Sequence, residues 1–65
     1  MHIKLNGEEF ESKAATVAAL LEEAQTPPAG VAVALNGRVV RRAEHAQTPL
    51  QEGDEVELIR AVQGG

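Results

Sequence analysis

The group most suited to carry out chemistry is the carboxylate of Gly65, at the end of the tail Val62-Gln63-Gly64-Gly65. Because glycine has no Cβ, the final pair can enter a narrow channel and adopt backbone angles that are closed to other residues. If it is extended, this tail reaches roughly 13 Å beyond the strand that precedes it. Such a tail suits presenting the carboxylate inside the active site of another protein, whereas the simpler interpretation is that chain ends tolerate glycine. Its meaning therefore depends on the elements before it.

No other residues form an obvious catalytic or metal-binding set. The chain has no cysteine, which excludes disulfides and thiolate ligands. His2 and His45 are the only histidines. A metal site would need them to converge with carboxylates, so we interpret both as ordinary surface residues and predict no metal site. Arg41 and Arg42 form the only basic pair, which we interpret as solvated loop charges, with contact to a partner protein as the alternative.

Length and composition narrow the classes of function. A chain of 65 residues with a single aromatic residue, Phe10, can build a small aliphatic core but has little material for the walls of a deep pocket. This argues against an enzyme. The net charge of −4 disfavours a nucleic-acid partner and suits docking on a positively charged protein. No segment has the length and hydrophobicity of a membrane span or a signal peptide, so we expect no membrane partner and a cytoplasmic location.

The elements that must position the tail begin with a hairpin. Residues 1–5 alternate apolar and polar side chains, which is typical of a half-buried strand. Asn6-Gly7 favours a tight turn, because both positions tolerate positive φ. Residues 8–11 then form the returning strand, with Phe10 toward the core and glutamates that suit the edge of a sheet.

A single helix of about ten residues follows this hairpin. Thr16 is a suitable N-cap, since its hydroxyl can accept a hydrogen bond from the first turn. Apolar side chains then recur at the spacing of one helical face: Val17, Leu20, Leu21 and Ala24. Thr26-Pro27-Pro28 cannot continue a helix and predicts its end.

A second hairpin is predicted after the helix. Residues 31–35 alternate valine or leucine with alanine, as in a strand. Asn36-Gly37 again favours a tight turn, and residues 38–40 form the short returning strand. Residues 41–47 are polar and irregular, with room for a turn of helix.

The last strand, residues 55–62, leads directly into the tail. Val56 and Leu58 lie on one of its faces, and Ile59 and Ala61 on the other. An exposed apolar patch at Ile59 and Ala61 suits contact with a partner beside the tail, and Arg41 is a further candidate for that contact. The simpler interpretation is that isolated apolar side chains are often exposed.

This order of elements has few compact arrangements at such a length. A mixed sheet of about five strands with one helix packed on one face satisfies all of it. This is an α+β fold of the β-grasp, ubiquitin-like type, in which the first and last strands lie side by side and parallel at the centre. We therefore predict a β-grasp domain over residues 1–61 and a flexible tail over residues 62–65.

Three segments resemble the ThiS-type sulfur carriers of thiamine biosynthesis. They are Val33-Ala34-Leu35-Asn36-Gly37, Leu50-Gln51-Glu52-Gly53-Asp54-Glu55-Val56 and the final Gly64-Gly65, and the similarity extends over nearly the whole chain. The related MoaD-type subunit of molybdopterin synthase is usually longer. It also tends to carry Phe-Pro-Pro before its glycines, where this chain has Ile59-Arg60-Ala61-Val62-Gln63.

The resemblance implies a mechanism for the tail. A ThiF-type adenylyltransferase would use ATP and magnesium to convert the Gly65 carboxylate to an acyl-adenylate. A persulfide sulfur donor would then replace the AMP and leave a thiocarboxylate, and a ThiG-type thiazole synthase would accept the sulfur. Val62, Gln63 and Gly64 would insert into the active sites of these partners. The chain itself would bind no cofactor and catalyse no step.

Two alternatives stay open from the sequence. One is a sulfur carrier of another pathway, such as a MoaD-like carrier for molybdopterin, which the acceptor enzyme would distinguish. The other is a ubiquitin-like modifier or an interaction domain. An isopeptide conjugate with lysine would favour the modifier, and full function without Gly65 would favour the interaction domain.

Overall fold

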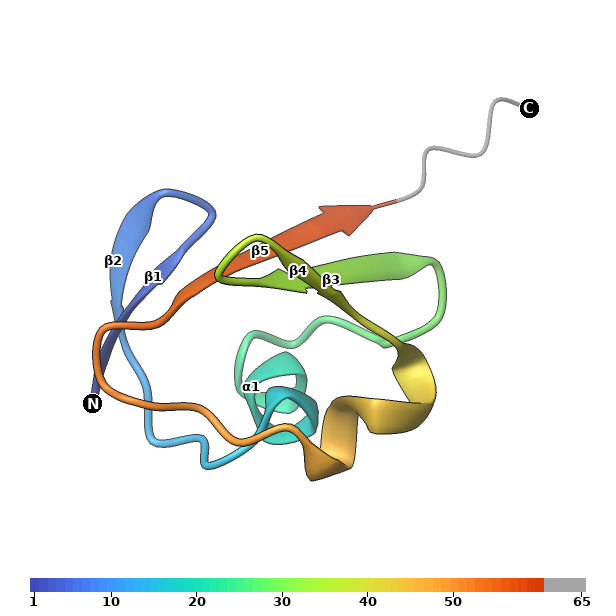
Figure 1. Ribbon diagram of the computed structural model, residues 1–65, viewed down its shortest axis with the longest axis horizontal. Coiled ribbons are helices and arrows are strands. Elements are labelled where there is room, and N and C mark those ends of the chain that lie inside the picture. Colours follow the sequence, from blue (N-terminus) through green and yellow to red (C-terminus); the bar gives the residue numbers. More distant parts are fainter. Residues whose placement is uncertain (61–65) are drawn as a thin grey trace.

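The computed structural model describes residues 1–60, which form a mixed five-stranded sheet with one α-helix (Figure 1). The elements in chain order are β1 (His2–Leu5), β2 (Glu8–Glu11), α1 (Val17–Glu23), β3 (Val31–Leu35), β4 (Arg38–Val40), the 3₁₀ helix η1 (Arg42–Gln47) and β5 (Glu55–Arg60). Among these residues, neither α1 nor η1 is long and apolar enough to cross a membrane.

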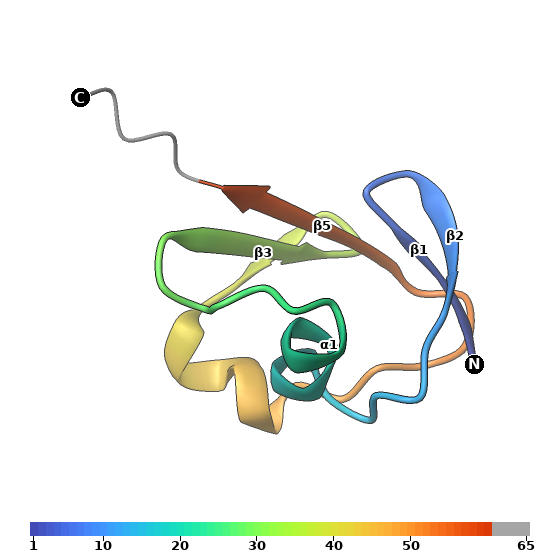
Figure 2. The same ribbon diagram turned by 180° about the vertical axis from the view of Figure 1, so that it is seen from behind.

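The strand order across the sheet is β2-β1-β5-β3-β4. β1 and β5 pair in parallel, and all other neighbours pair antiparallel. The view from behind shows α1 and η1 together on one side of the sheet (Figure 2). The predicted α+β, β-grasp arrangement with a parallel pair at its centre is therefore confirmed.

Both Asn-Gly turns have the predicted geometry. Asn6 and Gly7 have φ values of 53° and 82°, and Asn36 and Gly37 have values of 52° and 84°. Positive φ at both central positions gives the turn a twist that matches the flanking strands. The edge position of β2, with its exposed glutamates, is also as predicted.

The α-helix begins where predicted but ends earlier. The Thr16 hydroxyl accepts a hydrogen bond from Ala19 N at 3.2 Å, which confirms the N-cap. At the other end, Gln25 has a φ of 55°, and Thr26 N donates to Leu21 O at 2.8 Å. This is the hydrogen-bond pattern of a Schellman cap, which usually contains glycine. The cap ends α1 at Glu23, before the predicted break at the prolines.

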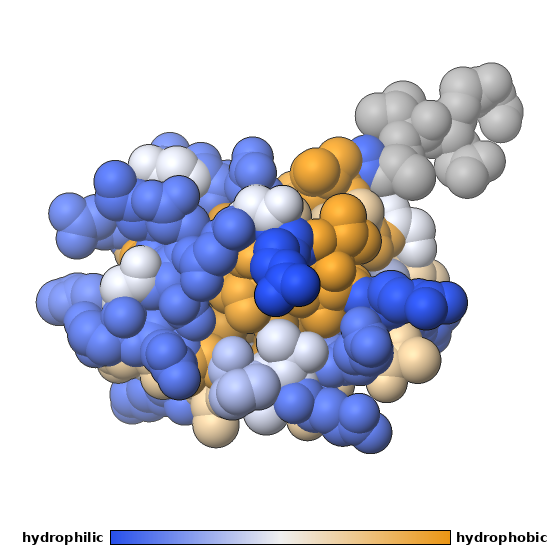
Figure 3. Space-filling model, in the orientation of Figure 1, coloured by the Kyte–Doolittle hydropathy of each residue, from blue (hydrophilic) through white to orange (hydrophobic). Residues whose placement is uncertain are grey.

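Surface hydropathy is uneven (Figure 3). Hydrophilic side chains cover the end of the molecule that holds the β1–β2 hairpin, and a hydrophobic area lies near the end of β5.

The register of the strands shows which residues lie on each face of the sheet, because successive residues of a strand point to opposite sides. Val33 and Val56 point toward α1 and are each 1% exposed. Ile59, which pairs with Ala32, points away from the helix.

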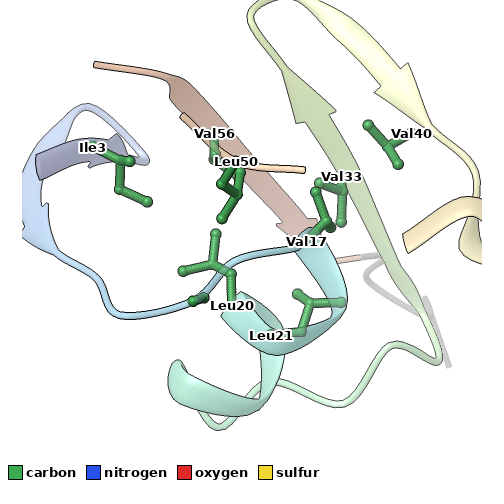
Figure 4. Close-up of a cluster of buried hydrophobic side chains, with 9 residues drawn as sticks. Ile3, Val17, Leu20, Leu21, Val33, Val40, Leu50 and Val56 are labelled. Carbon is green, nitrogen blue, oxygen red and sulfur yellow. The ribbon is translucent and has the colours of Figure 1, made fainter. Parts of the chain in front are cut away.

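The core lies between α1 and the inner face of the sheet (Figure 4). Val17, Leu20 and Leu21 of the predicted helical stripe are buried, while Ala24 is only half-buried. Phe10 packs against this core as a partly buried residue. The complete buried cluster is Ile3, Ala14, Val17, Leu20, Leu21, Val33, Val40, Leu50 and Val56.

The interpretation of His45 as a surface residue is wrong. His45 is 4% exposed, and its Nε2 lies 3.3 Å from Val40 O. Residues 42–47 form a 3₁₀ helix, in which every third residue shares a face. η1 packs against α1, and this contact buries His45 while the other residues of η1 stay exposed. His2 is exposed, as predicted.

Candidate functional site

β5 is the strand that leads toward the predicted working group. It pairs with β1 at Lys4↔Glu55 and Leu5↔Val56, and with β3 from Val56 to Arg60. Its direction is therefore set by neighbours on both sides at its start. The tail residues predicted to act in partner active sites, Val62, Gln63, Gly64 and Gly65, lie outside the described residues, as does Ala61.

Asn36 holds the start of β5 through its side chain as well as its backbone. Its Oδ1 accepts from Glu55 N at 2.9 Å, and its Nδ2 donates to Asp54 Oδ1 at 3.0 Å. Its own backbone N donates to Glu55 O at 2.7 Å. A residue predicted only as a turn former thus also satisfies the first backbone groups of the central strand.

Asn6 does the same on the opposite side of β5, further along the strand. Its backbone N donates to Val56 O at 2.9 Å, and its Oδ1 accepts from Leu58 N at 2.8 Å. The sequence reasoning missed this role of both asparagines. An Asn at a left-handed turn position has a free amide group, but only the fold places a strand within its reach.

The Gly53-Asp54 pair builds the turn from which β5 starts. Gly53 has a φ of 87°, which favours glycine. Asp54 Oδ2 accepts from Gln51 N at 2.8 Å, and Gly53 N donates to His2 O at 2.8 Å. These bonds fix where β5 begins relative to β1. They give a physical reason for the Gly53-Asp54 pair within the segment from Leu50 to Val56.

The outer face of the sheet carries an apolar patch near the end of β5. Ile59 is 56% exposed and Val39 is 74% exposed. The register places Ala32 beside Ile59 and Ala34 beside Val39. We call these four residues the outer patch. Ile59 lies on the predicted face, and Val39 was not predicted. Exposed apolar residues grouped in this way are typical of interaction sites.

The two arginines occupy different positions relative to this patch. Arg41 is exposed at the N-cap of η1. Arg42 lines a surface hollow of about 410 Å³ together with Pro28, Ala32 and Ile59. Arg42 is therefore the arginine that the fold brings beside Ile59, whereas Arg41 lines none of the described hollows.

A second hollow of about 270 Å³ lies between α1 and η1. It shares Pro28 and Arg42 with the first, and the buried His45 lines it. It is therefore a neighbour of the hollow at Ile59.

A polar cluster of Ser12, Lys13 and Glu23 holds the chain between β2 and α1. The Ser12 hydroxyl donates to Glu23 Oε1 at 2.6 Å, and Lys13 N donates to Glu23 Oε2 at 2.9 Å. The first of these bonds, and then the second, lower the pKa of Glu23. Ser12 is fully buried, so this cluster is structural.

Within residues 1–60, no group of three or more histidine, aspartate or glutamate side chains could hold a metal ion. The arrangement around β5 is built from backbone hydrogen bonds, side-chain hydrogen bonds of Asn6, Asn36 and Asp54, and apolar contacts. It fixes the direction of β5 and leaves an exposed apolar surface beside the end of that strand.

Known proteins resemble this chain over its whole length. The model of the ThiS family matches residues 3–65. The sulfur carrier protein ThiS of Escherichia coli is 36% identical over 66 aligned positions, covering 100% of both chains. The sulfur carrier protein ThiS of Thermus thermophilus is 39% identical, covering 94% of this chain and 95% of its own.

Solved structures agree with the sequence comparison. The crystal structure of the thiamine biosynthesis protein ThiS from Geobacter metallireducens superposes with a TM-score of 0.84 at 32% identity, covering 100% of both chains. A solution structure of a thiamine biosynthesis protein from the same organism gives 0.81 at 30% identity, covering 100% of this chain and 88% of its own. The family match, the full coverage and the shared fold together show that the chain belongs to the ThiS family.

Proposed function

We propose that this chain is a sulfur carrier of thiamine biosynthesis and that the Gly65 carboxylate carries the sulfur. The observation behind the proposal is that the family match and the E. coli relative both extend to the Gly64-Gly65 end. The relatives are named sulfur carrier proteins. The central strand β5 leads toward that end and is held by hydrogen bonds at its start.

The chemistry requires activation, because a carboxylate is a poor electrophile with oxide as its leaving group. A ThiF-type adenylyltransferase joins AMP from ATP to the Gly65 carboxylate and releases pyrophosphate, with magnesium bound by that partner. The outer sulfur of a persulfide then displaces AMP and forms an acyl disulfide with Gly65. A thiol reductant cleaves the S–S bond of this acyl disulfide, which leaves the thiocarboxylate on Gly65 and a disulfide on the donor side. A ThiG-type thiazole synthase accepts this sulfur. The chain supplies the carrier group and no catalytic residue or cofactor of its own.

The outer patch supports the docking part of the proposal. Ile59 and Ala32 form an apolar surface beside the end of β5, with Arg42 at the edge of the same hollow. Val62, Gln63 and Gly64 then enter the partner active site, where small side chains and glycine fit a narrow channel. Ala61 and Arg41 remain candidates for the rim of this contact.

The experiment is an intact-mass measurement after incubation with the adenylyltransferase, ATP, magnesium, a persulfide donor and a thiol reductant. The expected result is a mass gain that corresponds to one oxygen replaced by sulfur, located on Gly65 by fragmentation. A variant that lacks Gly65 keeps the described domain and should gain no mass. An unchanged mass of the full chain, under conditions that convert a known carrier, would contradict the proposal.

Transfer to thiazole synthase tests the pathway. The thiocarboxylate form should return to the carboxylate when thiazole synthase and its other substrates are added. If a molybdopterin synthase partner consumed the sulfur and thiazole synthase did not, the chain would be a carrier for another pathway.

A further inference from the structure

β5 has one edge that is paired with a strand only at its start, over two of its six residues. β1 reaches only Val56, because the chain turns away at Asn6. β3 continues to pair on the other side as far as Arg60. Figures 1 and 2 show β5 running on past the β1–β2 hairpin with β3 beside it. The second half of β5 is therefore an open sheet edge on the β1 side.

The hydrogen bonds identify which backbone groups face this open edge. Leu58 N donates to Asn6 Oδ1 at 2.8 Å, so the backbone N–H and C=O of Leu58 point to the β1 side. In a strand, alternate residues direct their backbone groups to the same side. Leu58 O and Arg60 N–H therefore both point to the open edge. Neither group has a hydrogen-bond partner within residues 1–60.

The side chain of Asn6 extends the hydrogen bonds between β1 and β5 by one step beyond the backbone of β1. The backbone N–H of Asn6 bonds Val56 O at 2.9 Å, and its side-chain oxygen bonds Leu58 N in place of a backbone carbonyl. The next step in this series would use Leu58 O and Arg60 N–H. β1 supplies no residue for this step, because its pairing with β5 ends at Val56.

We propose that an extended segment of the activating enzyme adds to this edge as a strand. It pairs with β5 on the same side as β1, beyond the point where β1 ends. The segment donates a backbone N–H to Leu58 O and accepts from Arg60 N–H. Strand addition of this kind derives affinity from backbone bonds and specificity from alternate side chains. Side chains of the added strand on the outer face would lie beside Ile59. The inference rests on the proposed function, which supplies the partner.

Location and charge favour a partner strand over a second copy of the chain. Residues 61–65 span at most about 17 Å, so any enzyme that reaches the Gly65 carboxylate must approach the end of β5. A second copy would bring together two chains that each carry a net charge of −4, and this repulsion opposes pairing. A strand from a basic partner meets no such repulsion.

Arg60→Pro is the variant that tests the added strand. Proline removes the N–H that faces the open edge. The bonds of β5 to β3 are kept, because Ile59 and Glu57, in alternation with Arg60, face β3. Arg60→Ala is the matched control, since it removes the side chain and keeps the N–H. We expect Arg60→Pro to weaken binding to the adenylyltransferase by about tenfold or more, and Arg60→Ala by less than about threefold.

Amide exchange in the unaltered chain gives a second readout that does not depend on the proline variant folding. The Arg60 amide should exchange quickly in the free protein and become protected when the adenylyltransferase is added. The amide of Glu57, which faces β3, should be protected in both states. Fast exchange of the Arg60 amide in the complex, or wild-type affinity of a folded Arg60→Pro variant, would overturn the inference.

The outcomes separate this inference from the proposed function. If the wild-type chain gains the thiocarboxylate while Arg60 stays unprotected, only the added strand is disproved. If the wild-type chain is not adenylated at all, the proposed function fails and the inference fails with it. Concentration-dependent protection of Arg60 in the isolated protein would assign the edge to a second copy and would likewise overturn the partner strand.

Discussion

The two ends of β5 differ sharply in how they are held. At the start, Glu55 and Val56 have neighbours on both sides, and Asn36 adds side-chain bonds. At the end, Ile59 and Arg60 pair only with β3 and are exposed to solvent. The bonds at the start fix the direction of the strand, and the open end is the part at which we propose that a partner binds.

The largest expected contrast between the two ends is in stability. Val56→Ala removes a side chain that is 1% exposed at the start, and the lost burial and the cavity should lower the free energy of unfolding by about 2 kcal/mol. Ile59→Ala removes a larger side chain at the exposed end and should change it by less than about 0.5 kcal/mol. Urea unfolding measures both, and equal effects would show that the end is as tightly packed as the start.

The two asparagines test the same contrast through hydrogen bonds. Glycine fits the positive φ at both positions, so Asn→Gly removes the side chain with little added strain. Asn36→Gly loses two side-chain bonds at the start of β5 and should cost about 2 kcal/mol. Asn6→Gly loses one and should cost about 1 kcal/mol. The reverse order in urea unfolding would mean that the open side of β5 carries more of the stability.

Binding should show the opposite pattern, with the larger effect at the end of β5. Ile59→Ala should weaken the complex with the adenylyltransferase by about tenfold, because an apolar anchor beside the tail is lost. Val39→Ala, on the same outer patch but away from β5, should weaken it by about threefold. Isothermal titration gives both values. If neither variant changed the affinity, the outer patch would not be the docking surface.

Acid provides a smaller effect that acts away from both ends. Ser12 and Lys13 lower the folded-state pKa of Glu23, so ionised Glu23 stabilises the fold above its unfolded-state pKa. That contribution is lost as the pH falls through the lower folded-state pKa. Glu23→Gln should therefore flatten the loss of stability in acid, measured as thermal midpoint against pH. Glu22→Gln, its exposed neighbour, is the control and should leave the slope nearly unchanged.

Much of the fold was predictable because its signals are local. The Asn-Gly pairs specify their turns, since few other residues accept positive φ at those positions. Thr16 specifies the start of α1, and Val17, Leu20 and Leu21 specify its buried face. The end of α1 was not predicted, because Gln25 adopts a left-handed conformation that glycine usually occupies.

The candidate site was predictable only in part. The alternation in β5 correctly assigned Ile59 to the face away from α1. The position of Arg42 beside Ile59 depends on how η1 packs. Val39, by contrast, lies on the outer patch because it pairs with Ala34 in the short β3–β4 hairpin. The contact of Arg42 with the surface at Ile59 joins segments that are distant in sequence, so no local pattern encodes it, whereas the face of Val39 follows from the alternation within a local hairpin.

By itself, the sequence determined the turns, the strand faces, the start of the helix and the chemical nature of the Gly65 end, since each depends on neighbouring residues. The tertiary structure decided what the same residues do beyond their own turn. Asn6 and Asn36 have nearly identical φ angles, yet one supports the middle of β5 and the other its start. Their side-chain amides can bond whichever strand is nearest, and only the folded sheet brings β5 between them.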